Sequence, residues 1–153
     1  MTGKYYDDLE VGQVIAHRWT RTITETDNLI FNGMTQNNQP LHVDEEFARA
    51  TPFGQRIVNG ILTMGLVVGL SVPDLTAGTI VANLGYDKIQ HPNPVFHGDT
   101  IRAESEILEM RESESKPDRG IVRIRQTGRK QTGEVVVALE RTVLFLKRPG
   151  GDT

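Results

Sequence analysis

The sequence contains no cysteine, few aromatic residues and no long apolar run. Without cysteine the chain cannot form disulfides, a thiolate metal site or a thiol nucleophile, and a cytosolic location is compatible with this composition. No apolar run reaches the roughly 18 residues that span a membrane, and the first residues lack the apolar core of a signal peptide. We therefore expect a soluble, cytoplasmic protein.

The formal net charge is only -3, and basic residues are scattered among acidic ones. No electrostatic footprint for a bulk nucleic-acid partner is present, although local binding of a small anion stays open. Four histidines at irregular spacing form no metal-ligand pattern, so we expect no metal site. The length of 153 residues fits a single domain over 1–153, with residues 149–153 as a frayed tail.

The first half of the chain predicts one strand followed by short helices. Residues 13–24 are rich in β-branched and aromatic side chains and predict a strand. A helix is expected to start near Thr24 and to stop at Gly33, and Pro40 is expected to keep the next segment irregular. Asp44 has the type and position of the N-cap residue of another short helix.

Residues 59–72 predict the central helix, with Asn59 as N-cap and Pro73 as terminator. The segment is apolar on nearly all sides, which is typical of a helix wrapped by other elements. Gly60, Gly65 and Gly69 each cost about 1 kcal/mol of helix propensity relative to alanine. We expect close approach of a neighbouring backbone to compensate.

The second half predicts strands over 79–89, 100–108, 121–126 and 134–146, joined as an antiparallel meander. One strand, short helices, a buried helix and four more strands form an α+β arrangement in which a curved antiparallel sheet wraps a helix. This order matches the outline of a hot-dog fold.

Four pieces of the chain together resemble the MaoC-like dehydratases, the family of (R)-specific enoyl-CoA hydratases. They are Tyr6-Asp-Asp-Leu-Glu-Val-Gly12, Asn37-Asn-Gln-Pro-Leu-His42, Ile57-Val-Asn-Gly60, and Asn93-Pro-Val95 with Gly98-Asp-Thr-Ile101. The resemblance implies a hot-dog homodimer whose substrate is an acyl-CoA bound along the dimer interface. It implies no cofactor other than the coenzyme A of the substrate.

The chain departs from the family pattern at two positions of the second piece. Asn37 stands where the family usually has its catalytic aspartate, and Gln39 stands where it has asparagine. A carboxamide cannot take up a proton near neutral pH, so the usual carboxylate–histidine pair cannot operate unchanged. His42 is then the natural proton carrier, because an ordinary imidazole titrates near pH 6.5.

We expect Asn37 to position the water and the N–H of Gly60 to stabilise charge on the thioester oxygen. Arg56, Asn59 and Gln39 are expected to contact the substrate. Each role has a structural alternative: a loop histidine, a turn-forming amide and a glycine selected for packing. The acids near these positions are interpreted as helix-start residues, although Glu25 or Asp27 could replace the missing carboxylate, and His91 and His97 are expected at the surface.

Three functions remain compatible with these residues. The first is hydration or dehydration of an acyl-CoA, including a short branched or dicarboxylic one whose second carboxylate would meet Arg49 or Arg56. The second is thioester hydrolysis, which would need a carboxylate near the thioester carbonyl. The third is a non-catalytic dimer that binds acyl-CoA.

Overall fold

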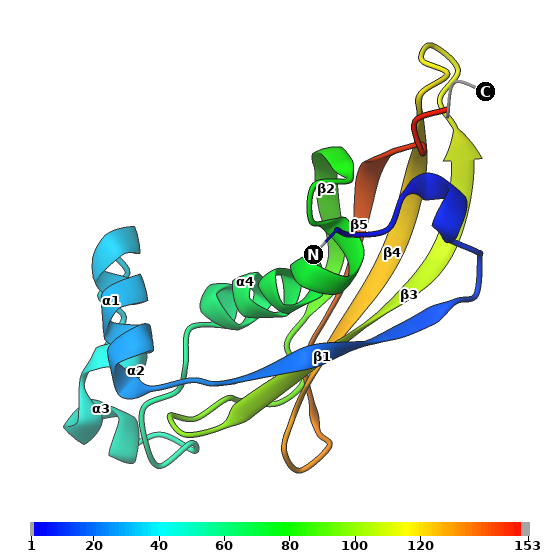
Figure 1. The fold of residues 1–153 in the computed structure, drawn as a ribbon. Coiled ribbons are helices and arrows are strands. Elements are labelled where there is room, and N and C mark those ends of the chain that lie inside the picture. The colour runs from blue at the N-terminus through cyan, green and yellow to red at the C-terminus, as the bar shows by residue number, and fades with distance from the viewer. Residues whose placement is uncertain (1, 151–153) are drawn as a thin grey trace.

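The computed structural model describes residues 2–150 as an antiparallel sheet with helices on one side and at one end (Figure 1). In chain order the elements are η1 (Tyr6–Asp8), β1 (Val14–Thr22), α1 (Glu25–Thr35), α2 (Pro40–Val43), α3 (Glu45–Arg49), α4 (Gly60–Ser71), η2 (Val72–Thr76), β2 (Ile80–Gln90), β3 (Thr100–Glu112), β4 (Arg119–Lys130) and β5 (Val135–Leu146).

The five strands lie in the order β1-β3-β4-β5-β2, and every neighbouring pair is antiparallel. The predicted meander is confirmed for β3, β4 and β5 but is wrong for β2, which pairs with β5 at the far edge. The alternation of apolar and polar side chains predicts that a segment is a strand, but it does not predict the strand's partner. The sheet edge at which β2 pairs depends on the path of α4 over the sheet.

Helix α4 lies across the concave side of the sheet and packs against β1, β3, β4 and β5 (Figure 1). Its buried residues, Thr63, Val67, Leu70 and Ser71, follow helical spacing and face the strands. Gly128 of β4 permits the close approach, because a Cβ at this position would collide with the side chain of Val67. The predicted α+β hot-dog architecture is confirmed.

The opposite side of α4 is open. Ile61 is 60% exposed, and outside the local turn of α4 no atom of the described residues lies within 4 Å of a Cβ placed on Gly65 or Gly69. The prediction that a neighbouring backbone packs closely against these two glycines is therefore wrong for residues 2–150. The α-helix ends at Ser71, just before Pro73 as predicted, but the chain continues as the short π-helix η2, because proline is tolerated in a first turn.

Helices α1, α2 and α3 stand beyond the N-terminal end of α4 (Figure 1). Thr24 caps α1 as predicted, but α1 runs through Gly33 to Thr35, because one glycine weakens a helix without stopping it. Pro40 does not keep its segment irregular; it opens α2, since its missing N–H is not needed in the first turn. The N-cap prediction for Asp44 is confirmed by its bond from the Phe47 N–H.

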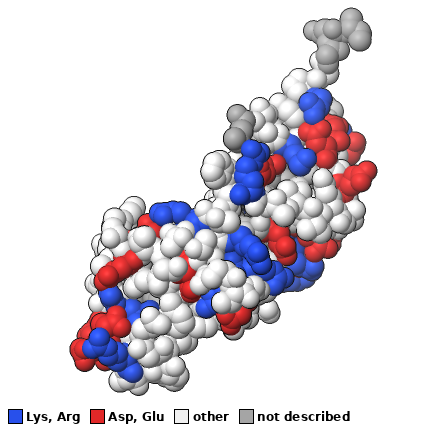
Figure 2. Space-filling view, turned by 60° about the horizontal axis from the view of Figure 1, so that its bottom comes forward, with Lys and Arg blue, Asp and Glu red and all other residues white. Residues whose placement is uncertain are grey.

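No helix within residues 2–150 combines the length and apolar character that crossing a membrane requires. On the face shown in Figure 2, Lys and Arg side chains lie interspersed with Asp and Glu. Of the predicted C-terminal tail, residues 149 and 150 have no regular structure, and residues 151–153 lie outside the described part of the chain.

Candidate active site

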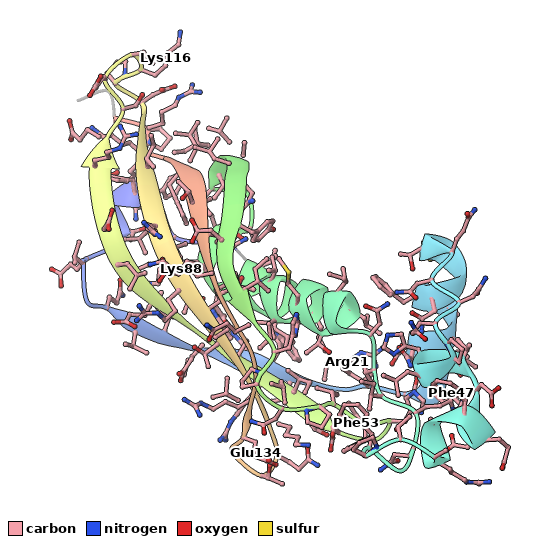
Figure 3. The ribbon with its side chains drawn as sticks, turned by 180° about the vertical axis from the view of Figure 1, so that it is seen from behind. Arg21, Phe47, Phe53, Lys88, Lys116 and Glu134 are labelled. Carbon is pink, nitrogen blue, oxygen red and sulfur yellow. The ribbon has the colours of Figure 1, made fainter. Side chains whose placement is uncertain are left out.

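A cavity of about 430 Å³ lies at the N-terminal end of α4 and brings His42 and Gly60 together. Its volume is in the range of small-molecule sites. Its walls come from α2, the connection before α4, the first turn of α4, the loop after β2 and the start of β5; the lining residues are His42, Phe53, Ile57, Val58, Gly60, Thr63, His91, Pro92, Asn93, Pro94, Val95 and Val136. Figure 3 shows Phe53 near this end of the molecule, far from Lys116.

His42 sits on α2 with its ring orientation set by one hydrogen bond. The ring Nδ1 lies 2.9 Å from the carbonyl oxygen of Ile57. A carbonyl can only accept, so Nδ1 carries the hydrogen and the neutral ring keeps its lone pair on Nε2. The backbone N–H of Ile57 in turn donates to the carbonyl of Leu41. This bond fixes the ring, and Nε2 is left as the nitrogen that can exchange a proton.

Three buried asparagines, here called the asparagine cluster (Asn28, Asn32 and Asn59), join α1 to the start of α4. Their exposed fractions are 0%, 1% and 3%. Asn28 Oδ1 accepts from the Asn59 N–H at 3.0 Å and from Asn32 Nδ2 at 3.2 Å, and Asn32 Oδ1 accepts from Asn59 Nδ2 at 2.8 Å. Asn28 Nδ2 also donates to the Ile57 carbonyl at 3.2 Å. The cluster therefore holds the same carbonyl that orients His42.

Asn59 was expected to contact the substrate as well as to cap α4. The cap is confirmed, since its Oδ1 accepts from the Ile61 N–H at 2.9 Å. Its Nδ2 is bonded to Asn32, and the residue is almost fully buried. The geometry therefore assigns Asn59 to the start of the helix, and substrate contact stays a prediction without geometric support.

Gly60 is the first residue of α4 and lines the cavity. Its backbone N–H has no hydrogen-bond partner within residues 2–150. First-turn N–H groups lack an intrahelical acceptor, and the helix dipole favours negative charge near them. An unpaired N–H of this kind, on a residue of the cavity wall, can bind an oxygen that gains negative charge.

Arg56 lies outside the cavity and is bound by two carboxylates. Glu45 and Glu25 each accept from its guanidinium at 2.6 Å, and these bonds, that of Glu45 foremost, raise the pKa of Arg56. Arg49 is paired with Glu46 at the surface. Neither arginine lines the cavity, so the structure does not bring the expected partner for a second substrate carboxylate to His42.

The two expected replacements for the missing carboxylate are engaged elsewhere. Glu25 pairs with Arg56, and Asp27 accepts from the Thr24 N–H and from Arg21. No Asp or Glu is among the residues that line the cavity. Within residues 2–150, no group of three or more His, Asp or Glu is arranged to hold a metal ion.

Asn37 and Gln39 shape the entry into α2. Asn37 Oδ1 accepts from the Gln39 N–H at 3.2 Å, and the Gln39 carbonyl accepts from the His42 N–H at 2.9 Å. Neither residue lines the cavity. This geometry favours the turn-forming interpretation of Asn37, while its role in positioning water stays a prediction.

His97 is not the surface residue that was expected, because it is half-buried. Its Nε2 accepts from Asn28 Nδ2 at 3.0 Å, which places the ring hydrogen on Nδ1. Burial, followed by the charge of Arg56, lowers the pKa of His97 and keeps the ring neutral. His91 is exposed as expected, but it also lies on the wall of the cavity. Its position two residues before the Asn93-Pro94-Val95 motif piece could have suggested this placement.

Comparison with known proteins agrees with this fold. The family model described as "MaoC like domain" matches residues 8–130. The mesaconyl-CoA hydratase of Cereibacter sphaeroides is 35% identical over 95% of this chain, which spans only 42% of that relative's length. The (R)-specific enoyl-CoA hydratase of Rhodospirillum rubrum is 31% identical, with 94% of this chain and 93% of that protein covered.

A solved structure extends the similarity to three dimensions. The MaoC-like dehydratase from Rhodospirillum rubrum superposes with a TM-score of 0.86 at 31% identity, covering 97% of this chain and 100% of that one. The sequence match and the shared fold lead to one conclusion: the chain belongs to the MaoC-like domain family.

Proposed function

We propose that this protein adds water to an enoyl-CoA, or removes it from a 3-hydroxyacyl-CoA, at the cavity between His42 and Gly60. The observation that carries the proposal is the presence, in one cavity, of a histidine whose Nδ1 is bonded to a carbonyl, which leaves Nε2 for proton transfer, and of a free N–H at a helix start. The first supplies proton transfer and the second stabilises an oxyanion.

In hydration, Nε2 of His42 takes one proton from water while the oxygen of that water bonds to C3. The electron pair of the C2–C3 double bond moves through C1 onto the thioester oxygen, which becomes an enolate oxygen beside the Gly60 N–H. The imidazolium then returns its proton to C2, and the thioester carbonyl re-forms. One base on one side of the substrate makes this a syn addition, and the same steps reversed remove water.

The relatives support a short, branched or dicarboxylic acyl group. One is named mesaconyl-CoA hydratase, and a second, from Chloroflexus aurantiacus, is named β-methylmalyl-CoA dehydratase and is 30% identical over 95% of this chain. The amide of Asn37, in place of a carboxylate, is compatible with a specialised branch of the family. Because acyl-CoA chemistry belongs to intracellular metabolism, a cytoplasmic location forms part of the proposal.

We further propose that two copies join along β2. Among the strands of residues 2–150, this edge strand pairs with β5 alone, and its second half is exposed on both faces. Leu84, Tyr86 and Ile89 are 54%, 42% and 42% exposed, and an uncovered apolar edge is a ready template for another strand. His91 follows this strand, so the seam would run beside the cavity. Light scattering of wild-type protein and of Leu84→Arg, expected to be a dimer and a monomer, tests this.

Thioester hydrolysis is disfavoured, because no carboxylate lines the cavity to activate water at the thioester carbonyl. A binding protein without turnover remains the alternative. One assay separates these functions: purified protein is mixed with mesaconyl-CoA or crotonyl-CoA, and the absorbance of the conjugated enoyl thioester and the release of free thiol are followed together. The proposal predicts loss of absorbance without thiol. Thiol release, or saturable binding with neither signal, would contradict it.

A further inference from the structure

The cavity contains a second histidine that neither the sequence motif nor the proposed mechanism uses. His91 follows β2 and contributes to the same wall as Gly60. Its ring has no hydrogen-bond partner within residues 2–150, so both ring nitrogens are available. His42 and His91 are the only titratable side chains among the lining residues.

The ring of His91 lies directly against Gly60. A Cβ placed on Gly60 would be 3.1 Å from Cε1, 3.2 Å from Nε2 and 3.3 Å from Nδ1 of that ring. These three atoms form the edge of the imidazole that carries both nitrogens. Glycine at position 60 therefore leaves room for a nitrogen-bearing edge beside the N–H that is proposed to receive the thioester oxygen.

The loop that carries His91 is anchored on two sides. Asn93 Nδ2 donates to the Val135 carbonyl at 2.9 Å, and Lys130 Nζ donates to the Pro94 carbonyl at 3.1 Å. On the other side the Val58 N–H donates to the Val95 carbonyl at 2.8 Å. Since Val58 is two residues before Gly60, these bonds tie the backbone of the loop to the start of α4.

We propose that His91 is a catalytic residue, whose ring N–H is the second donor to the thioester oxygen and acts together with the Gly60 N–H. Imidazole has at least one N–H in either charge state, so the donor persists across the working pH range. Two donors aimed at one developing oxyanion are worth more in the transition state than in the ground state. This inference rests on the proposed function and deepens it: His42 moves protons, and His91 stabilises charge.

The test compares His91→Phe, which keeps a ring but no donor, with His91→Gln, which keeps an N–H. The substrates are crotonyl-CoA and mesaconyl-CoA, and turnover by the wild-type protein is established first; without it the proposed function fails before this inference is reached. We expect kcat of His91→Phe to fall about 10²- to 10³-fold on both substrates with KM little changed. His91→Gln should recover most of this loss, and Lys116→Ala at the far end of the molecule should match wild type (Figure 3).

Three results would overturn the assignment while leaving the proposed function intact. Wild-type kcat in His91→Phe would show that the ring contributes nothing to the reaction. A loss confined to the KM of mesaconyl-CoA would show that His91 contacts the second carboxylate instead. A pH dependence of kcat that is present in the wild-type protein and absent from His91→Phe would show that His91 is the acid–base group instead.

Discussion

Helix α4 has a buried polar cluster at each end, and only the N-terminal one is hydrogen-bonded to a residue that lines the His42 cavity, through the carbonyl of Ile57. The asparagine cluster at that end leaves no side-chain nitrogen or oxygen unpaired. The cluster at the other end, here called the helix-end cluster, consists of His17, Ser71, Asp74, Ser105, Gln126 and Arg141. Within it, His17 Nδ1, Gln126 Oε1 and Arg141 Nε lack hydrogen-bond partners in residues 2–150.

The helix-end cluster resembles a catalytic arrangement more than the asparagine cluster does. His17 Nε2 lies 2.8 Å from Ser105 Oγ, and Asp74 lies 3.7 Å from the other ring nitrogen. Ser105 is nevertheless 0% exposed; Asp74 borders a separate hollow beside Pro73 and Arg18, but Ser105 does not reach it. A nucleophile that no substrate can reach does no chemistry. The comparison teaches that two features distinguish a functional site from a buried polar cluster. A substrate can reach its reactive side chains, and the polar groups that support these side chains have all their hydrogen bonds made.

The largest expected effect is that of His42→Ala. Removing the proton carrier should lower kcat/KM for crotonyl-CoA or mesaconyl-CoA about 10²- to 10⁴-fold while circular dichroism shows an unchanged fold. The measurement is steady-state loss of enoyl absorbance. Wild-type rates in this variant would remove His42 from the mechanism.

Asn28→Asp should have the next largest effect, because it removes the N–H donor to the Ile57 carbonyl and to His97 without changing side-chain size. A misplaced His42 is expected to cost up to about 10²-fold in kcat. Thermal unfolding of the same variant reports the accompanying loss of stability. Full activity despite a lower Tm would show that the asparagine cluster stabilises the fold without positioning the base.

Asn37→Asp should retain or raise hydration of simple enoyl-CoA, since it restores the carboxylate usual in the family at a turn position that tolerates either side chain. Activity is compared on crotonyl-CoA and mesaconyl-CoA. An inactive but well-folded variant would mean that the reaction requires the amide.

Ser105→Ala should act on stability alone. It leaves the buried Nε2 donor of Gln126 and the Nε2 of His17 without their shared hydroxyl partner, which typically costs about 1–3 kcal/mol. The urea midpoint should fall while kcat stays unchanged. A loss of turnover in the folded variant would show that the two ends of α4 are coupled.

The smallest effect is a decrease in stability on mild acidification. Burial lowers the pKa of both His17 and His97 in the folded chain. Below about pH 6.5 these two histidines therefore bind protons more readily in the unfolded chain than in the folded one. The free energy of unfolding falls as the pH decreases through that region. Urea midpoints on either side of that pH measure the decrease. His97→Gln, which still offers an acceptor to Asn28, should reduce it; an undiminished decrease would exclude His97 as a contributor.

Much of the fold was predictable because caps and alternation are local. Thr24, Asp44 and Asn59 cap the helices as predicted, and each predicted strand exists. The partner of β2 was not predictable, because strand order depends on long-range packing. The exposed side of α4 was also missed, since an evenly apolar helix does not indicate which side the sheet covers.

Of the candidate site, only the residues within the family's sequence motifs could be predicted. The shared cavity of His42 and Gly60 follows the two motif pieces that contain them. The asparagine cluster carried no such signal, because Asn28 and Asn32 are ordinary helix residues by sequence and meet Asn59 only in the folded chain. Arg56 was assigned to the substrate by its charge, and its two carboxylate partners become visible only in three dimensions.

The central claim is that an acyl-CoA thioester binds between His42 and Gly60. Its most direct test is a crystal structure of the protein with a saturated acyl-CoA, which cannot react. The account predicts the thioester oxygen within hydrogen-bonding distance of the Gly60 nitrogen and C2 and C3 beside Nε2 of His42. An acyl group bound elsewhere, such as in the apolar hollow of about 220 Å³ between α1 and α4, would contradict it.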